Sequence, residues 1–207
     1  MSEVFDRKQH WEQVYAGKSP LEVSWFQVKP EISLKLIQNT GIAKDGFIID
    51  VGGGASVLVD NLLRQGHENL AVLDISAGAL AAARERLGER AGDVEWFEAD
   101  VTRFSPPHAY ALWHDRAVFH FLTEQADREK YLRSLEKTLP RGGHIIIAAF
   151  AIGGPEKCSG LDIVQYDAPG LLDVLGEGFA LVEEMQETHV TPAGGAQEFS
   201  YFRLVRL

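Results

Sequence analysis

Cysteine is nearly absent from this chain of 207 residues: Cys158 stands alone, so no disulfide can form within the chain. This is typical of a protein from a reducing compartment. Residues 1–13 are largely polar and charged and lack the apolar core of a secretory signal. No stretch approaches the roughly 20 consecutive apolar residues of a membrane-spanning helix. We therefore expect a cytoplasmic protein with no membrane partner.

Basic residues are also in the minority. The 20 Lys and Arg face 30 Asp and Glu, which gives a net charge of −10. This balance disfavours a nucleic-acid partner, because such binding needs clustered positive charge. The rest of the composition, 45% hydrophobic and 24% charged, is that of an ordinary globular protein. We expect one domain over residues 1–207.

Strand-like and helix-like segments alternate through most of the chain. Apolar runs typical of strands occupy 47–51, 69–74, 94–98, 110–114 and 144–150. Helical patterns occupy 5–16, 30–39, 56–65, 76–87, 124–139 and 167–175. Two longer strands, 179–190 and 197–207, flank a turn rich in glycine and proline, which indicates a hairpin. The pattern predicts an α/β, Rossmann-like fold: a seven-stranded, mostly parallel sheet with an antiparallel C-terminal hairpin and helices on both faces.

The first strand ends in a glycine-rich loop, Asp50-Val-Gly52-Gly53-Gly54-Ala-Ser56. The second strand ends at Asp74, 20 positions after Gly54. This is the layout of a βαβ unit that binds a nucleoside-bearing cofactor. The glycines let the backbone approach the ligand, and Asp74 is placed to accept hydrogen bonds from ribose hydroxyls. The alternative is a tight strand-to-helix turn with no ligand, and the position of Asp74 argues against it.

Three cofactor classes compete for this loop. A nicotinamide dinucleotide prefers a third small residue where Val57 stands, and a P-loop needs a Gly-Lys-Ser/Thr that is missing. S-adenosylmethionine (SAM) has no phosphate and carries an ammonium that Asp50 can help to hold. The loop resembles the first motif of the class I SAM-dependent methyltransferases, with Ser56 in place of the usual last glycine.

That resemblance covers most of the chain and implies SAM as the cofactor. It implies a ribose site at residues 72–76, which include Asp74 and Ile75, and an adenine site at Asp100 and Val101. It places contacts to the methionine tail and the substrate at 113–116, where His114 lies. The turn at 139–144 and the reversed last strand also agree with this family.

The front of the chain resembles small-molecule methyltransferases of the thiopurine and tellurite type. In these enzymes an N-terminal aromatic helix covers the cofactor. The resemblance implies a cover over residues 1–40 that includes Tyr15 and Trp25, in front of a core at 45–207. An aromatic face beside a sulfonium cation is favourable by roughly 0.5–2 kcal/mol. The alternative is that these aromatic residues only close the hydrophobic core.

Two residues are candidates for catalysis. His120 follows the fourth strand and could act as a general base, although a histidine satisfied on a helix is an equal alternative. Arg116 could orient an anionic substrate or pair with Asp115. Cys158 lies in a glycine-bounded loop that should help to wall the substrate pocket, and we expect it to be buried and inert. We predict no metal, because metal-ligand spacings are missing.

These features predict a SAM-dependent methyltransferase that transfers a methyl group by direct SN2 displacement. The preferred acceptor is a small molecule, such as a thiol or another soft nucleophile. Two alternatives stay open. One is a protein lysine methyltransferase, and the other is a non-catalytic SAM-binding protein.

Overall fold

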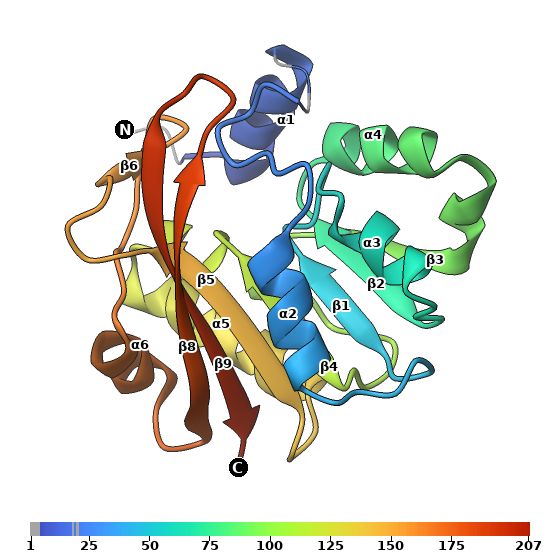
Figure 1. Ribbon diagram of the computed structural model, residues 1–207. Coiled ribbons are helices and arrows are strands. Elements are labelled where there is room, and N and C mark those ends of the chain that lie inside the picture. Colours follow the sequence, from blue (N-terminus) through green and yellow to red (C-terminus); the bar gives the residue numbers. More distant parts are fainter. Residues whose placement is uncertain (1–4, 18, 20) are drawn as a thin grey trace.

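The structure is a computed structural model that describes residues 5–17, 19 and 21–207. The predicted domain over residues 1–207 and the predicted cover over residues 1–40 include residues 1–4, 18 and 20, and at these positions both predictions lie outside the described residues. One sheet of seven strands runs through the described chain in the order β3-β2-β1-β4-β5-β9-β8 (Figure 1). Its strands are β1 (Ile48–Val51), β2 (Leu70–Asp74), β3 (Val94–Glu98), β4 (Leu112–Arg116), β5 (His144–Phe150), β8 (Phe179–Val190) and β9 (Ala196–Arg206).

Strands β1 to β5 pair in parallel, whereas β9 runs antiparallel to both β5 and β8. The predicted fold class is thus confirmed, hairpin included. The chain builds outward from β1 through β2 to β3, then returns to place β4 on the other side of β1. Because of this reversal, the chain continues from β1 toward one side of the sheet and from β4 toward the other, so the connections that follow these two neighbouring strands diverge. In open α/β sheets a ligand crevice forms at such a point, beyond the carboxyl ends of the strands.

Helices cover both faces of the sheet. They are α1 (Arg7–Gly17), α2 (Glu31–Asn39), α3 (Leu58–Arg64), α4 (Ala77–Leu87), α5 (Gln125–Thr138) and α6 (Ala168–Leu175). Because side chains alternate along a strand, β5 sends Ile145 and Ile147 into the core layer under α5 and α6. It sends Ile146 and Ala148 into the opposite layer, which α2 and α3 cover. None of the described helices is long and apolar enough to cross a bilayer.

Helix α1 differs from the other helices because it buries none of its residues. It lies beyond the carboxyl edge of the parallel strands, beside α4 and the tip of the β8–β9 hairpin (Figure 1). Of the predicted cover over residues 1–40, α1 has this position, while α2 packs into the core through Leu34, Leu36 and Ile37. The first helix therefore lies on the surface of the protein, with Trp11 and Tyr15 only half-buried.

Most element boundaries lie within one or two residues of the predictions, and three differences have a structural reason or add an element. Strand β4 is Leu112–Arg116 rather than 110–114, because the ladder with β5 begins at Leu112 and continues through polar Asp115 and Arg116. Helix α3 begins at Leu58, after Ser56 accepts a hydrogen bond from the Leu58 amide. The predicted loop after β5 contains a short antiparallel pair, β6 (Lys157–Cys158) and β7 (Leu161–Asp162).

Candidate cofactor and acceptor site

A pocket of about 910 Å³, open solvent included, lies at the carboxyl edge of the sheet. A smaller pocket of about 560 Å³ adjoins it, and Trp25, Val51, Gly52 and Arg116 line both. Predicted site residues that line the larger pocket are Tyr15, Trp25, Gly52, Asp74, Ile75, Asp100, Val101 and Arg116. Those that line the smaller one are Trp25, Asp50, Gly52, Gly53, Ser56, His114 and Arg116. The structure thus gathers residues from distant segments around one continuous space.

The glycine loop fits tightly between β1 and its surroundings. Gly52 and Gly54 have φ angles of +65° and +36°, and the Gly52 amide donates to the Leu73 carbonyl at 2.7 Å. A Cβ on Gly53 would lie 2.6 Å from Oδ2 of Asp50, and one on Gly54 would lie 2.6 Å from Oδ2 of Asp74. Two carboxylates therefore face the loop from opposite sides.

This donor set fits SAM. A carboxylate beside bare backbone suits an ammonium, and a second carboxylate at the end of β2 suits the two hydroxyls of a ribose.

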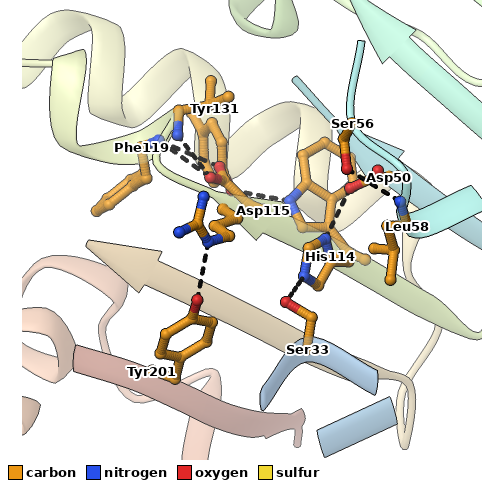
Figure 2. Close-up of polar contacts among 12 residues, drawn as sticks. Ser33, Asp50, Ser56, Leu58, His114, Asp115, Phe119, Tyr131 and Tyr201 are labelled. Atoms are coloured by element: carbon orange, nitrogen blue, oxygen red, sulfur yellow. Dashed lines mark hydrogen bonds and ion pairs between the residues drawn. The ribbon is translucent and has the colours of Figure 1, made fainter. Parts of the chain in front are cut away.

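Asp50 is held by a chain of buried side chains (Figure 2). Its Oδ1 lies 2.7 Å from Nδ1 of His114, and Nε2 of His114 lies 2.9 Å from the Ser33 hydroxyl. All three residues are buried. Because the carboxylate of Asp50 can only accept, Nδ1 of His114 donates to it, and Nε2 of His114 shares a hydrogen bond with the Ser33 hydroxyl. The chain fixes the carboxylate of Asp50, so that Oδ2 stays turned toward Gly53.

Asp74 occupies a second buried position. Its Oδ1 accepts a hydrogen bond of 2.8 Å from the amide of Ser76. Burial raises the pKa of Asp74 to about 7, and the nearby negative charge of Asp50 acts in the same direction. The carboxyl group is therefore poised to change its charge near neutral pH. Ligand hydroxyls that donate to it would favour the ionised form.

At the end of β3, Asp100 begins a short 3₁₀ turn, η2 (Val101–Arg103). Its Oδ1 accepts from the amide and the hydroxyl of Thr102 at 2.8 and 2.7 Å. Its Oδ2 lies 3.8 Å from the Arg7 guanidinium, which is also paired with Asp127. One oxygen of Asp100 is thus used by its own turn, and the other faces the pocket wall that α1 completes.

Aromatic side chains of α1 and of the 21–28 segment form the outer wall. The ring of Trp11 lies 5.8 Å from that of Trp25 and 5.0 Å from that of Phe121, both edge to face. Tyr15 packs on Trp25 at 6.2 Å. These aromatic residues line the larger pocket. Tyr15 and Trp25 therefore lie where a cover requires them, and Trp11 joins them.

Helix α1 is attached over the pocket by Glu12, which the sequence did not single out. Its carboxylate accepts from the amides of Ala77 and Gly78 at 2.7 and 3.2 Å and from the Ser76 hydroxyl at 3.0 Å. Partial burial opposes ionisation of Glu12, but these backbone hydrogen bonds leave its pKa lowered overall. A negative charge at the N-terminus of α4 is favourable there.

Arg116 lies at the junction of the two pockets. Its Nε donates to the Tyr201 hydroxyl at 2.8 Å, its Nη1 donates to the Trp25 carbonyl at 3.0 Å, and its guanidinium stacks 4.6 Å above the Phe199 ring. Its Nη2 lies 3.7 Å from Glu187. The alternative of an Arg116–Asp115 pair is not what the structure shows.

Asp115 instead belongs to the core side of β4. Its carboxylate accepts from the Tyr131 hydroxyl at 2.6 Å and from the amides of Val118 and Phe119 (Figure 2). Burial raises the pKa of Asp115 to about 6. This group anchors the turn after β4, which carries the pocket residues Ala117, Val118, Phe121 and Leu122.

His120 lies outside the pocket lining. Its ring is fully buried against Phe121 and Phe150, and neither nitrogen has a hydrogen-bond partner among the described residues. Burial lowers the pKa of His120 to about 3. These surroundings do not support a general base, which must reach the proton that it removes.

Cys158 is buried and lines the larger pocket. Its burial agrees with the expectation from the sequence, and burial raises the pKa of its thiol to about 11, which disfavours the reactive thiolate. No group of three or more His, Cys, Asp or Glu side chains in the described part of the chain is placed to hold a metal ion.

Comparisons with known proteins agree with this geometry. Residues 48–143 match the family model described as "Methyltransferase domain". The mouse EEF1A lysine methyltransferase 2 is 24% identical over 196 residues, covering 86% of this chain and 73% of that protein. The ubiquinone/menaquinone biosynthesis C-methyltransferase UbiE of Serratia proteamaculans is 28% identical over 120 residues. That match covers 56% of this chain, which spans about half the length of UbiE (47%).

Among solved structures, the N-methyltransferase NodS from Bradyrhizobium japonicum, in complex with S-adenosylhomocysteine (SAH), superposes with a TM-score of 0.73. It is 18% identical, with 97% of this chain and 99% of that one covered. The protein shares the fold of this solved structure. A structure described as the conversion of a disulfide bond into a thioacetal group during echinomycin biosynthesis gives 0.78 at 16% identity, over 97% and 92% of the chains. Together the family match, the relatives and the fold support a SAM-dependent methyltransferase.

Proposed function

We propose that this protein is a SAM-dependent methyltransferase that transfers a methyl group to a small molecule, at a thiol or another soft nucleophile. The observation that carries the proposal is the pair of buried carboxylates, Asp50 and Asp74, that face the bare backbone at Gly53 and Gly54. The matched methyltransferase domain and the SAH-bound structural neighbour support it.

In this proposal the smaller pocket takes the methionine tail, with Asp50 opposite the ammonium, His114 and Ser33 behind it, and Ser56 at the rim. The larger pocket takes the nucleoside, with Asp74 and Ile75 at the ribose and with Asp100 and Val101 at the adenine. Because Trp25 and Arg116 line both pockets, the sulfonium belongs near them. SAM supplies a methyl group on a positively charged sulfur, which is an activated leaving group.

The remaining task for the protein is to orient the acceptor and to exclude water. The nucleophile gives an electron pair to the methyl carbon and forms a new bond to it. The bond between the methyl carbon and the sulfonium sulfur breaks at the same time, and the sulfur keeps the electron pair of that broken bond. Helix α1 covers the reaction through the contacts of Glu12 and the aromatic wall. A wall of this kind suits a small acceptor better than an extended polypeptide.

The preference for a soft nucleophile rests on proton transfer. In this assignment, Asp74 binds the ribose hydroxyls and Asp100 binds the adenine, so neither is available as a base. Of the other described side chains that line the larger pocket, burial raises the pKa of Cys158 to about 11 and also raises the pKa of Tyr15 well above its usual range, while the guanidinium groups of Arg7 and Arg116 are hydrogen-bond donors only. An acceptor that ionises by itself near neutral pH, as thiols do more readily than alcohols, needs no base.

A second candidate is lysine methylation, which the likeness to the mouse EEF1A lysine methyltransferase 2 favours. A lysine amine must lose a proton before it attacks, and it needs a route past α1. The two candidates therefore differ in what they require of the cover, and a panel of acceptors separates them.

The test has two parts. Titration calorimetry with SAH should show binding that Asp74→Ala weakens about 100-fold, because a charged hydrogen-bond acceptor is lost. The surface variant Asp93→Ala should bind like the parent protein. Failure of the intact protein to bind SAH contradicts the cofactor assignment.

A methyl-transfer assay then compares thiols, phenols, amines and unfolded peptides. Turnover of thiols supports the proposal, turnover of peptides alone supports the lysine candidate, and SAH binding without any turnover supports a non-catalytic SAM-binding protein.

A further inference from the structure

Part of the larger pocket has no role in holding the cofactor. Its wall combines three aromatic rings, Phe121, Phe150 and Phe199, with the polar side chains of Arg116 and Gln197. Gln197 is on β9, far along the chain from the cofactor motifs, and no sequence pattern singles it out. This part of the wall is where an acceptor must lie if the proposed function is right.

Two polar atoms of this wall lack partners. Nη2 of Arg116 and Oε1 of Gln197 are buried, and neither has a hydrogen bond to the described residues. Glu187 lies 3.7 Å from Nη2, close enough to balance part of the charge but beyond hydrogen-bond length. Buried polar groups are normally hydrogen-bonded. One unpaired donor and one unpaired acceptor in the same pocket therefore point to a ligand that pairs with both.

The relative placement of these atoms follows from β9. Gln197, Phe199 and Tyr201 alternate with residues of the other face, so the three point to the same side of the sheet. The Arg116 guanidinium lies over Phe199 and is held by Tyr201. Gln197 is one same-face step, about 7 Å, beyond Phe199. The unpaired donor and the unpaired acceptor thus belong to side chains on the same side of β9, one over Phe199 and the other one same-face step along the strand.

We propose that Gln197 is a specificity-determining residue. It accepts a hydrogen bond from a donor group on the substrate that receives the methyl group, while Arg116 faces the nucleophilic atom of that substrate. The proposal rests on the proposed function. The acceptor class is a flat, largely apolar molecule with an anionic nucleophile at one end and a hydroxyl or N–H at the other. The nucleophile lies at the junction of the two pockets, and the far end donates to Oε1 of Gln197.

Two aromatic thiols test this assignment. 4-Hydroxythiophenol can donate to Gln197, whereas 4-methoxythiophenol has the same nucleophile and no donor. With the intact enzyme and SAM, we expect kcat/KM to be about tenfold higher for the hydroxy compound, because the methoxy compound leaves a buried acceptor unpaired. The preference should vanish in Gln197→Leu, which removes the hydrogen-bond-accepting oxygen of the side chain. It should survive in Gln197→Glu, which keeps an accepting oxygen.

Gln186→Leu is the matched control, since Gln186 is exposed on β8 of the same hairpin and lies outside both pockets. It should keep the tenfold preference, and all variants should bind SAH as the parent does. A preference that persists in Gln197→Leu, with both thiols still methylated, overturns the inference and leaves the proposed function intact. If the parent binds SAH but methylates neither thiol, the proposed acceptor class fails and the inference falls with it.

Discussion

The two halves of the pocket are built in different ways. In the proposed assignment, the cofactor half consists of residues near the ends of successive strands: Asp50 lies near the end of β1, Asp74 is the last residue of β2, and Asp100 follows β3. The acceptor half joins residues that are far apart in the chain, from Trp11 on α1 to Gln197 on β9. The first half repeats a local pattern, and the second exists only once the sheet has formed and reversed at its last strands.

This difference has a consequence for substitution. The cofactor half holds its polar groups in complete networks, such as Ser33–His114–Asp50. The acceptor half leaves polar atoms of Arg116 and Gln197 without partners in the described structure. We therefore expect changes in the cofactor half to act on SAH affinity, and changes in the acceptor half to act on the choice of acceptor.

The largest effect that separates fold from site should come from a pair of glycines. Gly54 and Gly66 both have positive φ, so alanine at either position costs about 1 kcal/mol of stability. Only at Gly54 would the added Cβ meet Asp74 and Tyr15, since nothing lies within 4 Å at Gly66. We expect Gly54→Ala to weaken SAH binding about 30-fold, while Gly66→Ala leaves it unchanged. Calorimetry with thermal unfolding measures both quantities, and equal SAH affinities in the two variants would contradict this role of the loop.

The next effect is a pH dependence with opposite signs for binding and stability. The pKa of Asp74 is raised to about 7, so below this pH its carboxyl takes up a proton and can no longer accept from both ribose hydroxyls. SAH affinity should fall about tenfold between pH 8 and pH 6. Because the folded-state pKa lies above the ordinary value, the contribution of Asp74 to stability is greatest at low pH and is lost as the pH rises through 7.

Asp74→Asn is the control for this titration. It cannot ionise, so its weaker SAH affinity should stay nearly flat between pH 6 and pH 8. Asp115, with a pKa of about 6, remains in this variant and contributes to the residual change in stability. An unchanged pH profile in Asp74→Asn would assign the titration to another group.

Much of this molecule could be predicted from sequence because local patterns determine it. Alternating apolar runs and helical segments gave the sheet, and the bounds of β3, β5 and β8 agree with the predicted ones. Strand β4 is displaced because its last residues, Asp115 and Arg116, are polar and nevertheless buried or half-buried through tertiary partners. Patterns of hydrophobicity cannot show such partners.

The same limit applies to the site. The glycine loop and the acids at strand ends have recognisable spacings, whereas Glu12, Ser33 and Gln197 are ordinary polar residues in amphipathic segments. Their roles depend on contacts across 64 or more positions of the chain, such as Glu12 to Ser76 and Ser33 to His114. His120 shows the converse error of a sequence-based prediction: it follows β4 in sequence, but it lines neither pocket.

A smaller effect should follow from Ser33, which lines the smaller pocket and holds His114, and through it Asp50. Ser33→Ala leaves Nε2 of His114 without its hydrogen-bond partner and loosens the carboxylate. We expect stability to fall by about 1 kcal/mol and SAH affinity about threefold. Ser200→Ala is the matched control, because this buried serine also loses one hydrogen bond, to Gln186, but lies outside the pockets. It should lose stability alone. An equal loss of SAH affinity in both variants would show that Ser33 has only a structural role in the core.

The smallest effect is expected at His120, and it bears on the acceptor half. The ring is buried against Phe121 and Phe150, and its lowered pKa of about 3 keeps it neutral, so it has neither the position nor the basicity to take a proton from an acceptor. With a thiol acceptor, His120→Leu should change kcat less than twofold and leave the pH profile of kcat in place. A 100-fold loss of kcat with unchanged SAH affinity and unchanged thermal stability would instead restore the general base, and would show that the pocket wall around Phe121 opens during turnover.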